Sequence, residues 1–458
     1  MKNEDQIWKN YIGKGHHNFN LFVSIISVFF IFFWSIENSI LNLRYLILLL
    51  IFPTIICVIY NFKNKDYFFI INFLLISFFL ISHLTINQLI LGENIKISTF
   101  YGVVFFLLIY AILYFYSLNV IQNLELIVFT FLIIFVFSSF ISLINYQQDA
   151  PYFCGGLKNF LNIDLGLPVD PNKNLIDYNL SFKHILFKEN SHLGMTAPAV
   201  IVYSIFKITT QKKSKIFTIL ATLFFIICLI KSSTTLFVGT ILSILIISFF
   251  NFKNISNKTL IVFAIVSLVF TTIILTDKQC KIRFIPAHFG QDIISKEFTD
   301  FTHDKLFKEK NSNDQVKKYG SASSSAFFRS LLISKYSLEM RPLGWGINRY
   351  SDGFDAYRNK NIKDFNLKFE PIENLNRKDG VNNFNKIIVE FGYLSIFIFI
   401  FILLYLTNKK INLEEKLFFL PIIITQMIRG AGYFNGGFTL ILIIMFLTYL
   451  NLNKDQKK

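Results

Sequence analysis

The chain has 458 residues, of which 53% are hydrophobic and 16% are charged, against roughly a quarter charged in an ordinary soluble domain. It carries 56 Phe, and its 45 Lys and Arg against 29 Asp and Glu give a net charge of +16. The shortage of charge argues against a soluble enzyme. We interpret the basic surplus through membrane topology, and nucleic acid is not expected as a partner.

The apolar residues fall into 12 blocks, most of them long enough to cross a hydrocarbon core of about 30 Å as helices. The hydrophilic stretches between them lack the sustained period-2 alternation of a sheet. We therefore predict an all-α, polytopic integral membrane protein with about 12 transmembrane helices. The predicted segments are 19–36, 43–60, 67–84, 97–118, 124–146, 192–209, 214–230, 234–250, 259–276, 387–407, 416–429 and 436–450.

The distribution of basic residues predicts the orientation of these segments. An even number of spans puts both termini on one side, and the loops and ends assigned to that side contain 17 Lys. The short loops on the opposite side contain only four basic residues, which are Arg44, Lys96, Lys231 and Arg429. This is the positive-inside asymmetry, so both termini are predicted to be cytoplasmic. No small-residue cleavage pattern follows the first segment, which is therefore expected to be retained.

Two hydrophilic stretches, 147–190 and 277–386, are predicted on the outer face, and long loops of this kind are commonly functional. The expected organisation is helices 1 to 9 with the first external loop over 1–276, a large periplasmic loop over 277–386, and helices 10 to 12 with a cytoplasmic tail over 387–458. Within the large loop, the pattern over 325–340 predicts an amphipathic helix that ends near Pro342 and Gly344.

Cysteine and metal-ligand patterns limit the chemistry. Cys154 and Cys280 fall one in each external loop, so a disulfide between the loops and two separate free thiols are both compatible with the sequence. No CxxC, HExxH, P-loop or paired zinc spacing occurs, and the seven His are scattered. We therefore predict no metal and no cofactor.

The most informative groups are arginines at the outer membrane boundary. A guanidinium is a planar fork of donors that stays charged and suits diphosphate oxygens, so a phosphate-bearing ligand is favoured. Trp345, between two glycines, suits a tight turn at the membrane interface. The alternative is that these arginines pair with Glu339, Asp352 and Asp355 or contact lipid headgroups. The candidates in the large loop are Arg329 first, then Arg341, Arg349 and Arg283.

Two further candidates flank predicted spans. Glu189 stands where the first external loop enters the sixth span, and it could serve as a general base with His192 orienting or sharing the proton. The alternative is an ordinary helix start, because an acid near Asn190 and Ser191 favours the helix dipole. Arg429 precedes a glycine-rich stretch and could face a headgroup diphosphate, or simply extend to the interface.

The arrangement resembles the O-antigen polymerase and O-antigen ligase superfamily of bacterial envelopes. The similarity rests on about 12 spans, a large late external loop, an arginine-led helix that ends in Pro342-Leu343-Gly344-Trp345-Gly346, and Asn382-Asn383-Phe384 ahead of Glu390-Phe391-Gly392-Tyr393. Glu189-Asn190-Ser191 is similar to the Glu-x-Ser element found before a span in many polysaccharide polymerases. The resemblance covers the whole topology through short motifs.

The resemblance implies a GT-C-like, metal-independent glycosyltransferase in the bacterial inner membrane, acting at its outer face. Its substrates would be oligosaccharides linked to undecaprenyl diphosphate. It would also contact membrane lipid, and a chain-length regulator protein could be a further partner. The external-loop arginine on which the family relies would be Arg329, with Arg341 and Arg349 matched less closely. Glu189 and His192 would be the other catalytic residues, and Arg283, Arg341, Arg349 and Arg429 would bind substrate.

The polymerase branch is favoured over the ligase branch. Ligases usually have a His-Asn pair about nine residues before the Glu of a Glu-x-Gly element, and here Val381 and Asn382 stand at that distance from Glu390. Two other classes stay open from the residues alone. One is a lipid-linked glycan flippase or transporter, although such proteins usually have two similar halves and short external loops. The other is an envelope scaffold or receptor.

Overall fold

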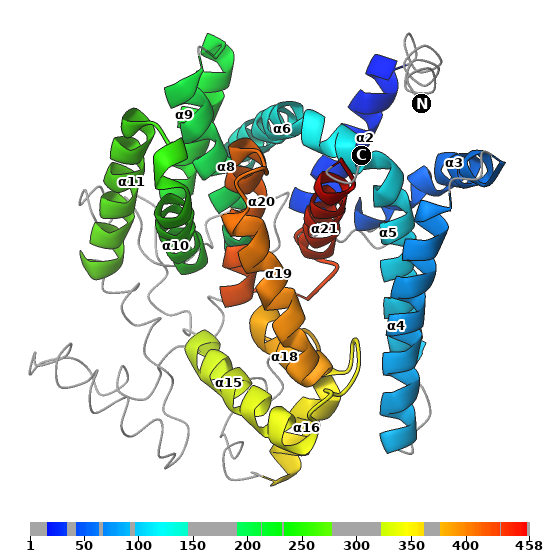
Figure 1. Cartoon of the computed structure of the whole chain (residues 1–458). Coiled ribbons are helices and arrows are strands. Elements are labelled where there is room, and N and C mark those ends of the chain that lie inside the picture. Colours follow the sequence, from blue (N-terminus) through cyan, green and yellow to red (C-terminus); the bar gives the residue numbers. More distant parts are fainter. Residues whose placement is uncertain are drawn as a thin grey trace, which may run out of the picture.

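In the computed structural model of the protein, every regular element of the described residues is a helix (Figure 1). The structure describes residues 16–33, 43–63, 67–91, 97–144, 190–211, 213–230, 233–276, 322–360, 376–430 and 432–455. The first elements are α2 (His16–Phe32), η1 (Leu43–Leu50), α3 (Ile51–Lys63), α4 (Phe68–Leu91), α5 (Ile97–Gln122) and α6 (Leu124–Ile144). Then follow α8 (Asn190–Thr210), α9 (Lys215–Ile230), α10 (Thr234–Asn251), η3 (Phe252–Asn254) and α11 (Asn257–Thr276). The remaining elements are α15 (Ala322–Met340), α16 (Tyr350–Lys360), α18 (Asn383–Phe391), η5 (Gly392–Leu394), α19 (Ser395–Thr407), α20 (Leu413–Ile428) and α21 (Phe438–Asp455).

The predicted all-helical membrane fold is confirmed at this level. The described part of each of the 12 predicted segments is mainly helix, as expected where lipid forces the backbone to bond internally. Within the part of the chain that the structure describes, eight stretches have the length and hydropathy of a membrane span, among them His192–Thr210 and Asn383–Thr407. Three apolar helices, Leu21–Phe32, Lys215–Leu229 and Phe438–Leu452, are shorter, and α20 has 16 residues. Twelve crossings and a GT-C-like arrangement stay predictions.

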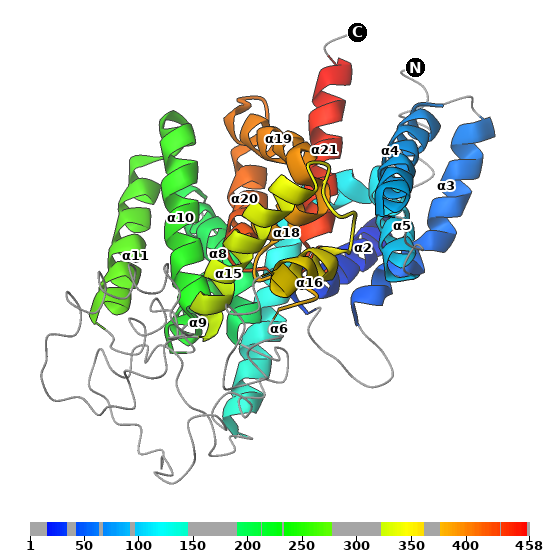
Figure 2. The same ribbon diagram turned by 90° about the horizontal axis from the view of Figure 1, so that it is seen from below.

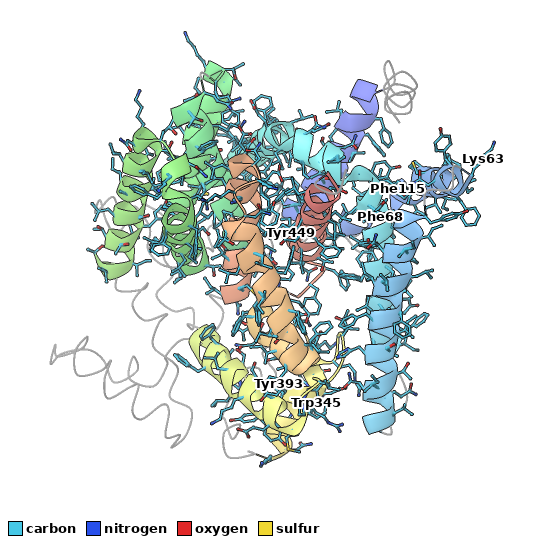
Figure 3. All side chains as sticks on the ribbon, viewed as in Figure 1. Lys63, Phe68, Phe115, Trp345, Tyr393 and Tyr449 are labelled. Atoms are coloured by element: carbon cyan, nitrogen blue, oxygen red, sulfur yellow. The ribbon has the colours of Figure 1, made fainter. Side chains whose placement is uncertain are left out.

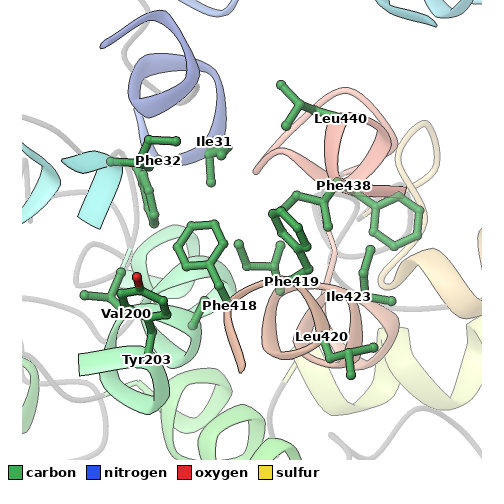
Figure 4. Packing of buried hydrophobic residues seen from close by; sticks show 14 of the residues in the cluster. Ile31, Phe32, Val200, Tyr203, Phe418, Phe419, Leu420, Ile423, Phe438 and Leu440 are labelled. Atoms are coloured by element: carbon green, nitrogen blue, oxygen red, sulfur yellow. The ribbon is translucent and has the colours of Figure 1, made fainter. Parts of the chain in front are cut away.

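The centre of the molecule is formed by α8, α10 and α20, which pack closely on one another. Close approach depends on a small residue: a Cβ added at Gly239 of α10 would lie 2.6 Å from the Thr425 side chain of α20. Figure 4 shows the adjoining apolar cluster, in which the Phe418 ring lies 5.8 Å from that of Tyr203 and 6.3 Å from that of Phe32. These contacts join α2, α8 and α20 into one core.

The edge of the molecule is apolar on its outside, as a lipid-facing surface requires. Helices α3 and α4 lie at one flank in both ribbon views (Figures 1 and 2). Only 17% of each of their span windows is buried, and Phe52, Phe78 and Leu89 expose most of their side chains. Since no water-soluble fold leaves such a face open, these helices support the assignment to a membrane.

The two ends of the bundle differ. The start of α2 and the end of α21 lie at the same end in Figure 1, whereas α15 and α16 lie at the opposite end, beneath α18 and α19. Side-chain positions agree, because Lys63 is at the upper end of Figure 3 and Trp345 and Tyr393 are at the lower end. Which end faces the cytoplasm stays a prediction.

A network of charges closes the end predicted to be cytoplasmic. Lys207 of α8 is almost fully buried and pairs with Glu414 of α20 at 2.6 Å and with Glu125 of α6 at 3.6 Å. Lys213 contacts the same Glu125 oxygen at 2.6 Å. The network therefore ties α6, α8 and α20 together at their ends, where a buried ammonium needs carboxylate partners.

The predicted amphipathic helix of the large loop is confirmed as α15. It ends at Met340, immediately before Arg341 and Pro342, as proposed from the proline and glycine signals. Its buried face carries Arg329, Ser330, Ile333, Ser334 and Ser337, spaced at helical intervals. The second helix, α16, packs on α15 and α18. We call α15, α16 and the connection between them the cap.

Candidate functional site

The connection between α15 and α16 is bonded along its length to the C-terminal end of α18. The N–H groups of Trp345 and Gly346 donate to the carbonyl oxygens of Val389 and Glu390, each at 2.9 Å. The Tyr393 N–H donates to the Pro342 carbonyl at 2.8 Å. Three backbone bonds therefore fix the turn to the point where α18 gives way to η5.

Two glycines make this close approach possible. Gly344 has φ +82° and Gly392 has φ +57°, a region that favours glycine. A Cβ on Gly392 would overlap the Pro342 carbonyl, and one on Gly344 would overlap the Glu390 carbonyl. The Pro-Leu-Gly-Trp-Gly and Glu-Phe-Gly sequences, which carried the family resemblance, are thus in direct contact.

Glu390 is the deepest charged group of the site, with 0% of its surface exposed. Its Oε2 accepts from the Asn348 N–H at 2.9 Å and its Oε1 from the Tyr350 N–H at 3.1 Å. Lys386, one turn earlier on α18, places Nζ 3.3 Å from Oε1. The carboxylate therefore caps the start of α16 from another helix, as an acidic group at a helix N-terminus does.

Arg329 lies on the buried face of α15, with 9% of its surface exposed. Its guanidinium carbon is 5.7 Å from the centre of the Phe354 ring of α16. Burial raises the pKa of Tyr350, while the Arg329 charge acts in the opposite direction. Arg329 thus stands over the first turns of α16, close to the residues that Glu390 holds.

The other two cap arginines differ from Arg329 in their contacts. Arg349 is 5% exposed, and its Nε donates to Asp352 at 2.5 Å, so the alternative of carboxylate pairing is met for this residue. Arg341 is partly exposed, and its guanidinium carbon lies 5.2 Å from the Trp345 ring. Asp355 binds Arg377, through Nε at 2.7 Å, instead of any of the predicted arginines.

The first turn of α18 connects the cap to the core of the bundle. Asn385 donates to the Ser330 hydroxyl of α15 at 2.7 Å. On the other side, Asn383 donates to Gln426 of α20 at 3.3 Å, and the Gly430 N–H donates to the Val381 carbonyl at 3.1 Å. Because Ser330 adjoins Arg329 and Gly430 adjoins Arg429, the two arginines flank this turn.

His192 and Arg429 lie at the same level of the bundle. Helices α8 and α20 are antiparallel, since Lys207 pairs with Glu414 and Tyr203 packs on Phe418. His192 precedes Lys207 by 15 residues and Arg429 follows Glu414 by 15, about 22 Å of helix in each case. Both therefore belong to the end of the bundle that carries the cap. Glu189, Arg283, Cys154 and Cys280 lie outside the described residues, so their predicted roles stay predictions.

Several residues of the site were not anticipated from the sequence. His83 of α4 lies 2.9 Å from the Leu343 carbonyl through Nε2 and stacks on Phe391 at 5.1 Å. A carbonyl only accepts, so Nε2 donates to it in the tautomer that carries the proton there; the Asn87 side-chain nitrogen lies 3.2 Å from the same Nε2. Gly102 of α5 lies against the Asn348 side chain. The signal that existed was the presence of a histidine within an apolar span, where a polar group needs a partner.

Lys386 and Tyr433 were also missed. Besides Glu390, Lys386 donates to the Lys378 carbonyl at 3.2 Å and faces the Tyr433 ring at 5.2 Å. Tyr433 belongs to the glycine-rich connection between α20 and α21. Burial raises the pKa of Tyr433 well above its ordinary value, and the nearby Glu390 carboxylate adds to the rise, so the phenol is protonated. A lysine and a glutamate four apart at the entrance to a span would have been the signal.

Among the described residues, no group of three or more His, Cys, Asp and Glu side chains is placed to hold a metal ion. Comparison of the chain with models of protein families, with curated proteins and with solved structures found no match. Chemically, the described site offers guanidinium and ammonium groups held by aromatic rings and carboxylates at one end of a membrane bundle. Such groups bind anions, and phosphate oxygens above all.

Proposed function

We propose that the protein is a glycosyltransferase of the inner membrane that polymerises oligosaccharide repeat units carried on undecaprenyl diphosphate. The observation that carries the proposal is the placement of Arg329: a nearly buried guanidinium over the Phe354 ring of α16. Its neighbour Ser330 is bonded to Asn385 in the first turn of α18, at one end of the helical bundle. A buried charge of this kind is costly unless it is paired or used, so its position marks a candidate site for an anion. A lipid-anchored diphosphate is the anion that reaches such a depth from the bilayer.

The reaction would be a substitution at the anomeric carbon of the growing chain. The bond from that carbon to the diphosphate oxygen breaks, and a hydroxyl oxygen of the next lipid-linked unit forms the new glycosidic bond. The hydroxyl proton passes to a base, for which Glu189 with His192 is the candidate. The bonding pair leaves with the undecaprenyl diphosphate, whose added charge Arg329 would stabilise, with Arg341, Arg349, Arg429 and Arg283 binding substrate.

The test uses purified protein in vesicles with undecaprenyl-diphosphate-linked oligosaccharide, read out as glycan length on a gel. Arg329→Ala is expected to lower elongation at least about 100-fold. The matched control is Arg377→Ala, which removes an arginine that precedes α18, is 42% exposed and pairs with Asp355 of α16. Elongation by Arg329→Ala at the wild-type rate, with equal protein in the membrane, would refute the assignment.

The same assay separates the other candidate functions. Movement of the lipid-linked sugar across the vesicle without elongation would indicate a flippase. Transfer to added lipid A in preference to a second lipid-linked unit would indicate a ligase. If the lipid-linked substrate is active but no elongation, movement or transfer to lipid A occurs, the result would contradict a glycosyltransferase. A scaffold or receptor would then be the remaining candidate.

A further inference from the structure

Glu390 has a place in the structure that the proposed reaction does not use. Its carboxylate is fully buried at the meeting point of α18, the cap and the connection between α20 and α21. Each oxygen is already engaged by a backbone N–H, and Lys386 lies against one of them. A carboxylate held in this way is badly placed to accept a substrate proton, so its contribution must be sought in what it holds.

What Glu390 holds is the start of α16. The two N–H groups that it accepts belong to Asn348 and Tyr350, on either side of Arg349. Asn348 has φ +59°, so the chain bends sharply there and needs fixing from outside. From this start, α16 carries Tyr350 and Phe354 to Arg329, whose guanidinium lies over the Phe354 ring.

The same contacts restrict how a phosphate could bind. The N-terminus of a helix is ordinarily a site for anions, because its N–H groups and dipole point outward. At α16 the Glu390 carboxylate already occupies that position. A diphosphate would therefore depend on guanidinium groups whose position follows from α16, and not on the helix end itself.

We infer that Glu390 is a positioning residue: by fixing the start of α16 it sets Arg329 in the geometry that grips the lipid diphosphate, while Lys386 neutralises its charge. This inference rests on the proposed function. A purely structural alternative is that Glu390 serves only to neutralise the buried Lys386. The two accounts differ in what happens when both charges are removed together.

The decisive substitution is Glu390→Gln, which keeps the size of the side chain. Its amide offers one acceptor oxygen and a donor NH₂, so only one of the Asn348 and Tyr350 N–H groups keeps its acceptor. Lys386→Met then removes the ammonium left without its carboxylate. If Glu390 acts by holding α16, the double variant Glu390→Gln/Lys386→Met stays defective, because the second N–H is still not accepted.

The experiment measures binding of undecaprenyl diphosphate to purified protein in nanodiscs, together with kcat and KM of elongation. Glu390→Gln is expected to weaken binding about 10- to 100-fold and to lower kcat on the order of 100-fold, as misplacement of catalytic groups does. Arg329→Ala should weaken binding as well, and Glu390→Gln/Arg329→Ala no further than Arg329→Ala, since both act through one guanidinium. If Glu390→Gln only disturbed packing, its loss of binding would instead add to the loss caused by Arg329→Ala.

The outcomes separate the inference from the proposed function. Weak binding by Arg329→Ala with normal binding by Glu390→Gln, additive effects in the double variant, or recovery in Glu390→Gln/Lys386→Met would each overturn the positioning role and leave the polymerase in place. Normal binding by Arg329→Ala would remove the main support of the proposed function, and the inference would fall with it.

A second measurement serves if Glu390→Gln does not accumulate in membranes. Amide exchange of the wild-type protein is followed with and without undecaprenyl diphosphate, at the Asn348 and Tyr350 N–H groups. Slower exchange of both on binding would support the inference, because the ligand then tightens the contact with Glu390. Unchanged exchange of both, with binding confirmed in the same sample, would overturn it.

Discussion

Replacing Gly392 by Ala tests whether the docking of the cap on α18 governs the stability of this end of the molecule. Gly392 has φ +57° and ψ −136°, a conformation that L residues adopt at a cost of about 1–3 kcal/mol. In addition, the new Cβ would overlap the Pro342 carbonyl and lie 2.5 Å from the Gly344 nitrogen, both of them rigid backbone. The two segments must therefore separate.

Separation costs the backbone bonds that join the segments. The bonds from Tyr393, Trp345 and Gly346 would lengthen or break, at about 0.5–1.5 kcal/mol each. With the conformational strain, the expected loss of unfolding free energy is roughly 3–7 kcal/mol. Under the proposed function, elongation should also fall, because the turn leads directly into the start of α16.

The matched control is Gly432→Ala. Gly432 has φ +92°, but among the described residues a Cβ there would approach only a carboxylate oxygen of Asp379, at 3.6 Å. Gly432→Ala therefore introduces the positive-φ strain without overlap with backbone atoms. Its loss of unfolding free energy should stay at about 1–3 kcal/mol. Both variants are melted in detergent and followed by the retained monodisperse fraction. Equal melting temperatures for Gly392→Ala and Gly432→Ala would refute the reasoning from close approach.

Three further variants have defined expectations. Lys207→Met should lower the unfolding free energy by about 3–5 kcal/mol, because Glu414 loses its ammonium partner. In the same melting assay, the double variant Lys207→Met/Glu414→Gln should recover part of that loss. Asn385→Ala should lower the unfolding free energy by about 1–3 kcal/mol, because it removes the donor to the Ser330 hydroxyl. Adding Ser330→Ala should lower it little further. If the losses of the two substitutions added, a direct bond between the side chains would be contradicted. Arg377→Ala should change the unfolding free energy by less than about 1 kcal/mol, because its ion pair with Asp355 is exposed. The hydrogen bond with Asp355 raises the pKa of Arg377. A larger change in melting temperature would show that the pair is not a surface contact.

Hydropathy predicted the helical segments because the physics is local. A stretch in lipid must satisfy its own backbone, and the apolar blocks mark where this happens. The end of α15 was predictable for the same reason, since Pro342 and Gly344 follow it directly. The break inside segment 387–407 was not predicted. It depends on the Tyr393 N–H reaching the Pro342 carbonyl, a partner that the local pattern does not reveal.

For the candidate site, the sequence indicated charged groups whose roles stay predictions, and it did not indicate the contacts that hold them. Arg329 could be singled out because it is the only arginine of α15, a helix rich in apolar residues and serine. His83 could not be assigned to the site, because its partner Leu343 is 260 residues away. The role of Glu390 likewise depends on the N–H groups of Asn348 and Tyr350, and no feature of the sequence shows that a carboxylate caps a helix from a distance. The sequence shows which side chains can form hydrogen bonds, but their partners are determined by how distant segments pack together.

The contacts of the turn also connect distant helices into one mechanical unit. His83 bonds the Leu343 carbonyl from α4, while Trp345 and Gly346 are bonded to α18. A lipid substrate that moved α4 away from α18 would have to break the histidine bond or the backbone bonds. If the histidine bond broke, the turn would stay on α18; if the backbone bonds broke, the start of α16 would shift, and with it the Phe354 ring that faces Arg329. Under the proposed function, the histidine bond is therefore the contact through which the spacing of α4 and α18 would act on the guanidinium.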